Sequence, residues 1–185
     1  MMKSSVALLL VVSAAACSST PKTATERQTY EQRAETTLME MEARDPTLRP
    51  LLDQAIAYVV FPSVGKGGVI VGGAFGRGIL FENHQPSGFV ELKQGSFGAQ
   101  LGGATFSELV VLNDPYAVQQ IKSGKFKFGA NVSAVALTAG AGRAASFARN
   151  PNPVFTMARG GLMVDVSVTG QSLSYKPFID EQAMR

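Results

Sequence analysis

The chain is poor in the residues that most often carry covalent cross-links and catalysis. It has one cysteine, one histidine and no tryptophan among 185 residues. A single cysteine excludes an intramolecular disulfide, and a single histidine leaves little material for a histidine-based metal site. Charged residues make up only 17% of the chain, and the net charge is +3. That charge is far below the basic footprint of a nucleic-acid-binding protein, so we expect no nucleic acid partner.

The N-terminus has the pattern of an export signal. One lysine precedes an apolar run over residues 6–12, and small residues lead to Cys17. The run is too short to be a stable membrane anchor. A cysteine directly after "SAAA" resembles a bacterial lipobox, whose thiol takes a diacylglycerol and becomes the new N-terminus. The alternative is plain secretion with a free cysteine.

We therefore expect a signal peptide over 1–16 and a lipidated tether over 17–25, carrying acyl chains such as palmitate. Bacterial lipoproteins that lack Asp after the cysteine usually go to the outer membrane, and here Ser18 stands at that position. The expected localisation is the bacterial cell envelope, lipid-anchored at the outer membrane.

The glycine-free first third of the chain predicts two helices. The first is amphipathic and ends before Pro46, with an apolar stripe at Tyr30, Ala34, Leu38 and Met41. This stripe could pack on the domain or lie on a membrane. Packing is favoured because the polar face is acidic rather than basic. The following stretch "TLRPLLDQAIAYVVF" predicts a second helix, with Pro62 beyond its end.

Beyond these helices, short apolar and alternating runs are typical of β-strands. One helix interrupts them at "NDPYAVQQIKSGK", where Asp114 can cap the helix, Pro115 fits its first position and Gly124 ends it. The predicted fold class is α+β and β-rich. We expect a strongly curved or barrel-like antiparallel sheet with N-terminal helices and one short inserted helix.

The predicted domain spans 26–185, helical over 26–60 and β-rich over 61–176. Its glycines all lie between residues 65 and 170. The stretch "GKGGVIVGGAFGRG" is not a Walker loop, because no Gly-Lys pair in the chain is followed by Ser or Thr. "TAGAGRAAS" is followed too closely by prolines to open a dinucleotide-binding crossover. We therefore predict that the chain binds no cofactor. The glycines are expected to bend the sheet or to let neighbouring backbone approach closely.

Four blocks together resemble the SYLF lipid-binding domain family: "AYVVFPSVGKGGVIVGGAFGRGIL", "GSFGAQLGGATFSELVVLND", "GKFKFGANVSAVAL" and "ARGGLMVDVSVTG". The resemblance covers roughly residues 50–176. It implies a lipid-binding domain without catalytic activity. Eukaryotic members are membrane-phosphoinositide binders, some of which bundle actin filaments, and bacterial members are largely lipoproteins. For this chain the resemblance implies anionic or phosphate-bearing phospholipid as the ligand.

Candidate ligand residues are the basic side chains beside glycine or in alternating strands, because a cation next to glycine can hold phosphate together with backbone N–H groups. They are Lys66, Arg77, Lys125, Lys127, Arg143 and Arg159. The alternative for each is a plain surface charge. The residues from 61 onward hold eleven basic and seven acidic side chains, a mild cationic excess that suits anionic lipid.

The function we expect is non-catalytic binding of membrane phospholipid by a lipid-anchored envelope protein. One alternative is a structural or scaffolding lipoprotein that binds an envelope protein partner. The other is an envelope hydrolase. It would need His84, or a carboxylate pair drawn from Glu91, Glu108 and Asp165. We predict no catalytic residues and no metal site.

Overall fold

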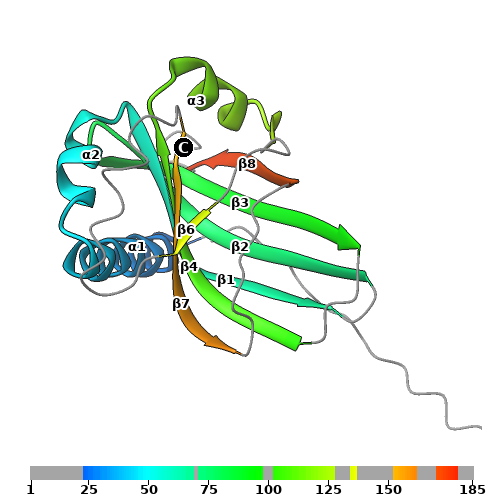
Figure 1. Cartoon of the computed structure of the whole chain (residues 1–185). Coiled ribbons are helices and arrows are strands. Elements are labelled where there is room, and N and C mark those ends of the chain that lie inside the picture. The colour runs from blue at the N-terminus through cyan, green and yellow to red at the C-terminus, as the bar shows by residue number, and fades with distance from the viewer. Residues whose placement is uncertain are drawn as a thin grey trace, which may run out of the picture.

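The computed structural model describes residues 23–68, 71–97, 102–127, 134–136, 152–161 and 170–178. This part of the chain contains three helices and eight strands (Figure 1). In chain order they are α1 (Ala24–Arg44), α2 (Leu48–Gln54), β1 (Ala57–Gly68), β2 (Val71–Glu82), β3 (Gln85–Phe97), β4 (Gly102–Leu112), α3 (Pro115–Lys122), β5 (Phe126–Lys127), β6 (Ala134–Ala136), β7 (Val154–Gly161) and β8 (Gln171–Pro177). The fold is α+β, with two N-terminal helices and one short inserted helix, as predicted.

All eight strands belong to one sheet, in the order β5-β8-β3-β2-β1-β4-β7-β6. Neighbouring strands run antiparallel, except that β6 and β7 run parallel. Over the described residues the sheet is open, and the prediction of a strongly curved or barrel-like sheet is wrong. The edge strands β5 and β6 are two and three residues long, too short to pair with each other and close it.

The second predicted helix is shorter than expected. It ends at Gln54, and the stretch "AYVVF" belongs to β1. Val59, Val60 and Phe61 are fully buried, because β1 is a central strand with side chains packed on both of its faces. A strand covered on both faces has a continuous apolar run, which periodicity alone cannot separate from a buried helix.

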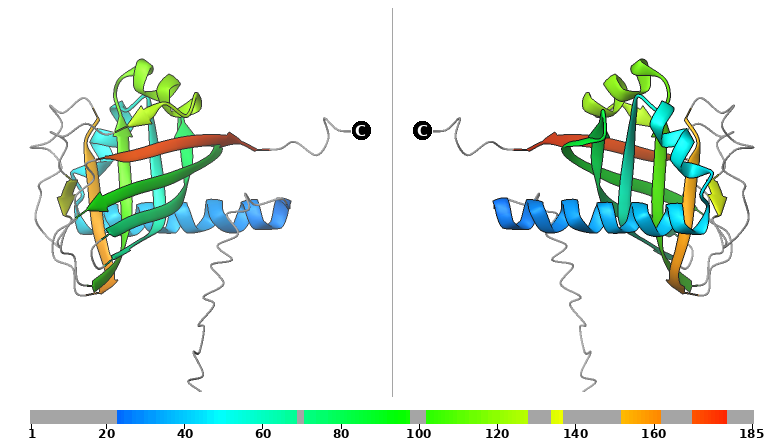
Figure 2. Two further views of the ribbon diagram at one scale, coloured as in Figure 1. Left: turned by 90° about the vertical axis from the view of Figure 1, so that its right-hand side faces the viewer. Right: turned by 90° about the vertical axis from the view of Figure 1, so that its left-hand side faces the viewer.

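The helices cover opposite faces of the sheet (Figure 2). On one face, α1 and α2 pack over Tyr58, Val60 and Ile79. On the other, α3 packs over a second cluster that includes Phe106 and Val110. The α1 face is called the outer face below, and the α3 face the inner face.

Helix α1 begins with a reciprocal cap, because the Thr23 side chain accepts from the Glu26 backbone N–H and the Glu26 side chain accepts from the Thr23 N–H. Its buried residues, Ala34, Thr37 and Met41, face the sheet. The prediction that the apolar stripe packs on the domain is confirmed. Asp114 and Pro115 likewise begin α3 as predicted, and Gly124 follows its end at a φ of +68°.

The glycine-rich stretch over 65–78 lies in the two arms of the β1–β2 hairpin, with residues 69–70 outside the described part. At three described positions an added Cβ would come closer than 3.0 Å to a neighbouring atom, and at Gly76 that atom belongs to the Val64 side chain. A Cβ on Gly78 would overlap the carbonyl oxygen of Val60, and a Cβ on Gly88 would overlap the Tyr175 ring. Gly76 and Gly78 therefore serve the packing of the sheet, and the stretch forms a pair of strands, not a phosphate loop.

Replacing Gly78 with alanine should destabilise the fold by about 2 kcal/mol, because the neighbouring backbone of β1 must move to admit the methyl group. The matched control is Gly65→Ala in β1, where nothing lies within 4 Å of the position that the added methyl group would take. Urea denaturation of both variants measures the difference. Equal stabilities for Gly78→Ala and Gly65→Ala would contradict the close-approach explanation.

Candidate functional site

A β-bulge in the central strand opens the surface beside α1. The pairing of β1 shifts register between Val60 and Ser63 on one side, and between Phe61 and Val64 on the other. Pro62 stands inside this irregular segment, where its lack of an N–H costs no ladder hydrogen bond. Its carbonyl oxygen accepts a hydrogen bond of 2.7 Å from the hydroxyl of Ser107 in β4.

Two adjacent hollows lie between α1 and this bulge, and both are lined by Arg33, Pro62 and Ser63. One has a volume of about 490 Å³ and reaches Arg159. The other has a volume of about 240 Å³ and reaches Arg77. We call the two hollows together the arginine groove, because Arg33, Arg77 and Arg159 line it from α1, β2 and β7.

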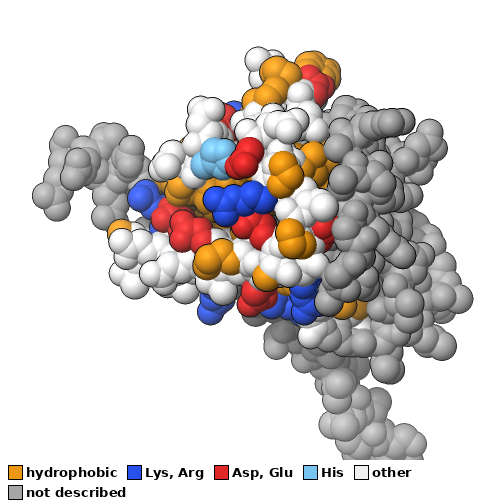
Figure 3. Space-filling model, turned by 60° about the vertical axis from the view of Figure 1, so that its left-hand side comes forward, with side chains coloured by type: hydrophobic (Ala, Val, Ile, Leu, Met, Phe, Trp, Pro, Cys, Tyr) orange, Lys and Arg blue, Asp and Glu red, His pale blue; other side chains and the backbone are white. Residues whose placement is uncertain are grey.

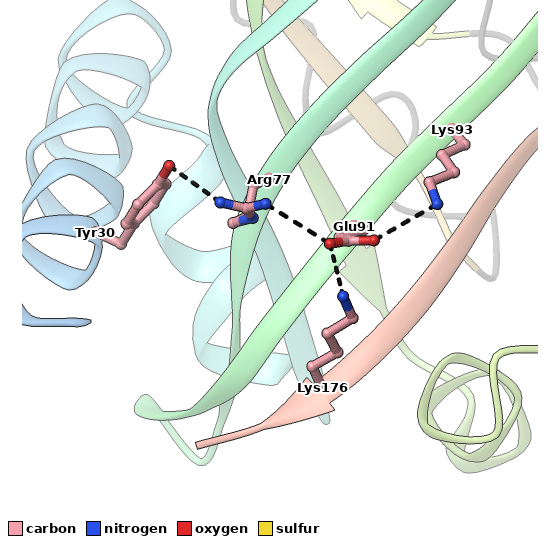
Figure 4. Close-up of polar contacts among 5 residues, drawn as sticks. All are labelled: Tyr30, Arg77, Glu91, Lys93 and Lys176. Carbon is pink, nitrogen blue, oxygen red and sulfur yellow. Dashed lines mark hydrogen bonds and ion pairs between the residues drawn. The ribbon is translucent and has the colours of Figure 1, made fainter. Parts of the chain in front are cut away.

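Arg77 links α1 to a charge cluster on the outer face (Figure 4). Its Nη1 donates to the Tyr30 hydroxyl at 3.4 Å, and its Nη2 lies 3.7 Å from Glu91 Oε1. Lys176 donates to the same carboxylate oxygen at 2.9 Å, and Lys93 lies 3.6 Å from Glu91 Oε2. One buried carboxylate thus holds three cations from β2, β3 and β8, so the cluster carries a net positive charge.

The protonation of Glu91 follows from these partners. Burial alone would raise the pKa of Glu91, but the hydrogen bond and charge of Lys176, with the charges of Lys93 and Arg77, outweigh it and hold the pKa below its ordinary value. Glu91 is therefore ionised at neutral pH. The Nε of Arg77 is buried and has no hydrogen-bond partner within the described part of the chain.

Arg159, at the far end of the groove, ties α1 to the sheet. Its Nε donates to Ser107 Oγ at 2.6 Å, its Nη2 donates to Thr37 Oγ1 at 3.2 Å, and its Nη1 lies 2.5 Å from Glu40 Oε2. All three nitrogens of this guanidinium have partners. The charge of Arg159 is therefore balanced by Glu40, and its role in this structure is to hold α1 in place.

Arg33 differs from both. It is exposed on α1, lines both hollows, and makes no hydrogen bond or ion pair with any described residue. It is the groove arginine most available to an incoming anion.

The other predicted ligand residues lie elsewhere. Lys66 points to the inner face and is 7% exposed. Lys125 and Lys127 are exposed beside α3 and in the edge strand β5, remote from the groove. Arg143 and the predicted lipid-attachment residue Cys17 lie outside the described residues.

Lys66 contributes instead to a buried polar centre around Glu108. Glu108 is fully buried in β4 and accepts a hydrogen bond from Gln171 Nε2 at 3.1 Å. Burial raises the pKa of Glu108 to about 8, against the opposing effects of the Gln171 hydrogen bond and the Lys66 charge. Glu108 and Glu91 lie on opposite faces of the sheet, so they cannot form the carboxylate pair of a hydrolase. Asp165 is outside the described residues.

His84 lies in the β2–β3 turn, where Asn83 and His84 both have positive φ, as a two-residue hairpin requires. Its Nδ1 is 3.5 Å from the Tyr58 hydroxyl, and it borders a third hollow of about 340 Å³. The residues that line this hollow include Glu35, Glu42 and Asp53 but no serine, threonine or cysteine. Figure 3 shows this side of the molecule, with acidic and basic side chains intermixed around the histidine.

Sequence reasoning predicted Arg77 and Arg159 and missed three partners of the site. Arg33 is one of several charged residues on an amphipathic helix, and nothing in its spacing identifies it as a ligand-binding residue. Lys93 and Lys176 are not beside glycine. The usable signal was alternation in β3, where Glu91 and Lys93 share the face of Phe89 and so stand together on one side of the sheet.

Residues 93–182 match the sequence model of the Ysc84 family, described as Las17-binding protein actin regulator. Ysc84 and SYLF denote the same domain family, so the resemblance is confirmed over this range. The match includes Lys93, Arg159 and Lys176, whereas Arg33 and Arg77 precede it. No curated protein matches the chain.

Two further properties bear on the site. None of the helices in the described ranges is long and apolar enough to cross a membrane. Among the same residues there is no group of three or more His, Cys, Asp or Glu side chains arranged to hold a metal ion.

Replacing Glu108 with glutamine should flatten the pH dependence of stability. Since its pKa is raised from 4.5 to about 8, the folded protein keeps a proton that the unfolded chain has lost between these values. The stabilisation is complete below pH 4.5 and is lost as the pH rises through 8. Wild type should lose about 2–4 kcal/mol between pH 5 and pH 8.5 from this group, and Glu108→Gln should not.

Urea unfolding of both proteins at the two pH values measures this. At pH 8.5 the variant should be the more stable of the two. Parallel stability profiles would contradict a neutral, buried Glu108.

Proposed function

We propose that this chain is a SYLF-type lipid-binding protein of a bacterial envelope, anchored through Cys17 to the outer membrane, and that its arginine groove binds phosphate-bearing lipid head groups without catalysis. The observation that carries the proposal is Arg33: an exposed arginine without a described partner, at the junction of two hollows of about 490 and 240 Å³. Guanidinium groups bind phosphate through paired, charge-assisted hydrogen bonds.

The surroundings of Arg33 suit an anion. Hydroxyl groups of Thr36 and Ser63 line the same hollows and can donate to phosphate oxygens. The Glu91 cluster beside Arg77 adds positive charge at the narrower hollow. The Ysc84 (SYLF) family match supports lipid binding as the class of activity, and domains of this family are generally binding modules and not enzymes.

The ligand class follows from the proposed location. Phosphoinositides are not a bulk lipid of bacteria, and actin is absent from the envelope. We therefore propose an anionic phospholipid, or another lipid with a phosphate head group, as the natural ligand. Such a site should weaken as salt screens the charges.

The test is co-sedimentation of the full chain carrying Cys17→Ser, which removes the proposed lipid attachment, with phosphatidylglycerol-containing and purely phosphatidylcholine vesicles. We expect binding to the anionic vesicles only, weakened by salt. Arg33→Glu should lower the affinity about tenfold, because it reverses the free charge in the groove. The matched control is Arg49→Glu, an exposed helix arginine outside the groove, which should bind as before.

Equal losses in the two variants would mean that only total charge matters and that the groove is not the site. Absence of vesicle binding by the Cys17→Ser chain would favour a second function, binding of an envelope protein partner. The family description names a protein-binding activity, toward Las17, which makes that alternative specific. Its own test is co-purification of a stoichiometric partner from envelope extract.

A further inference from the structure

An exposed aromatic side chain stands at the mouth of the arginine groove. Phe75 in β2 is 43% exposed, and it lines the narrower hollow together with Arg33 and Arg77. In the register of the sheet it lies directly opposite Lys93 of β3 on one side and Gly65 of β1 on the other. Large apolar side chains are exposed at four of the described positions, namely Met39, Ile56, Phe75 and Tyr116, and Phe75 is the one among them that lines the arginine groove.

The charges around Phe75 are mostly positive. Lys93 and Lys176 have side chains 60% and 41% exposed, and Arg77 follows Phe75 on the same face of β2. The one carboxylate among them, Glu91, is 3% exposed and already engaged by all three cations. An approaching surface therefore meets an apolar centre ringed by cations.

The surface next to Phe75, toward the ends of the strands, is made of glycines and has no side chains at the next row of positions. The next outward-facing positions across the four central strands are Gly95, Gly73, Gly67 and Gly103, which are in register with one another. Nothing lies within 4 Å of where a Cβ would stand on Gly65 or Gly95. Helix α1 crosses the sheet without covering these strand ends, which extend past it (Figure 1). At these four positions no side chain rises beside Phe75.

We propose that this face, defined by Phe75, Lys93, Arg77 and Lys176, docks on the surface of an anionic phospholipid bilayer, with Phe75 inserted among the lipids beside the head group held in the groove. The inference rests on the proposed function and adds the orientation of the domain and the depth of its contact. The lipid is then recognised in place in the membrane, not extracted from it.

A bilayer fits this face better than a second copy of the chain. A symmetric dimer would bring the same cation-rich patch against itself, and like charges facing each other are unfavourable. Anionic lipid phosphates complement the lysines, and the ring of a phenylalanine gains from transfer into the hydrocarbon boundary. The combination of an apolar centre and basic rim is the pattern of interfacial membrane binding.

Because the chain has no tryptophan, a single substitution gives a site-specific fluorescent reporter. Phe75→Trp in the full Cys17→Ser chain should show a blue-shifted emission when phosphatidylglycerol vesicles are added, and quenching by vesicles with brominated acyl chains. The matched control is Tyr116→Trp. Tyr116 is 65% exposed on α3, over the opposite face of the sheet, and its reporter should not change.

Sedimentation separates failure of this inference from failure of the proposed function. If the reporter chains sediment with vesicles but emission at position 75 stays unchanged, this face is not the docking surface, although lipid binding stands. If neither chain sediments, the proposed function and this inference both fall. Equal blue shifts at positions 75 and 116 would also overturn the inference, because binding would then have no defined orientation.

A second pair of variants tests the same face without a reporter. Lys93→Glu should weaken binding to the anionic vesicles about tenfold, and Phe75→Ser about threefold to tenfold. Lys125→Glu, an exposed lysine after α3, is the control for charge and should have little effect. Phe75 is exposed, so thermal unfolding of Phe75→Ser should remain near wild type, whereas Lys93→Glu places a second carboxylate beside Glu91 and its thermal unfolding is measured with its affinity. Unchanged affinity in both variants would overturn the proposal.

Discussion

Pro62, a residue that cannot donate a backbone hydrogen bond, stands in the central strand of the sheet, and the site depends on how the fold accommodates it. The register of β1 shifts on both sides of this proline, and its carbonyl turns to accept from Ser107. Ser107 in turn accepts from Arg159, which reaches α1 through Thr37. The irregularity therefore does two things at once. It opens a groove under α1, and it supplies the polar contacts that hold α1 over that groove.

The local features of this fold follow from the sequence, because short-range chemistry decides them. The cap at Asp114, the proline at position 115 and the stripe of α1 act within a few residues. The "AYVVF" stretch was misassigned because burial on both faces, a tertiary property, removes the alternation that identifies a strand. The groove could not be predicted from the sequence either, because it too depends on tertiary structure. Arg33 and Arg159 are far apart in the chain, and they line one hollow only because α1 lies across the sheet.

Two glutamates on one sheet show how strongly environment decides charge. Glu91 is nearly buried but has three cationic partners, so it stays ionised, and it organises Arg77, Lys93 and Lys176 into a cluster. Glu108 is fully buried with a neutral amide as its hydrogen-bond donor, and burial raises its pKa to about 8. The difference gives the sheet two unlike faces. The outer face keeps exposed positive charge, whereas the inner one holds its polar groups inside the core.

The amphipathic helix would be the simplest membrane-binding element, yet its apolar stripe is packed on the sheet and clamped there by Arg77 and Arg159. Contact with lipid then falls to what α1 leaves uncovered, namely the groove and the strands beyond it. Such a surface need not bind tightly. An acyl anchor at Cys17, as proposed, would keep the domain within a short tether of the bilayer, and this high effective concentration lets a weak, salt-sensitive contact remain occupied. The anchor would thus keep the protein at the membrane, and the groove would set the orientation of the domain and select the lipid.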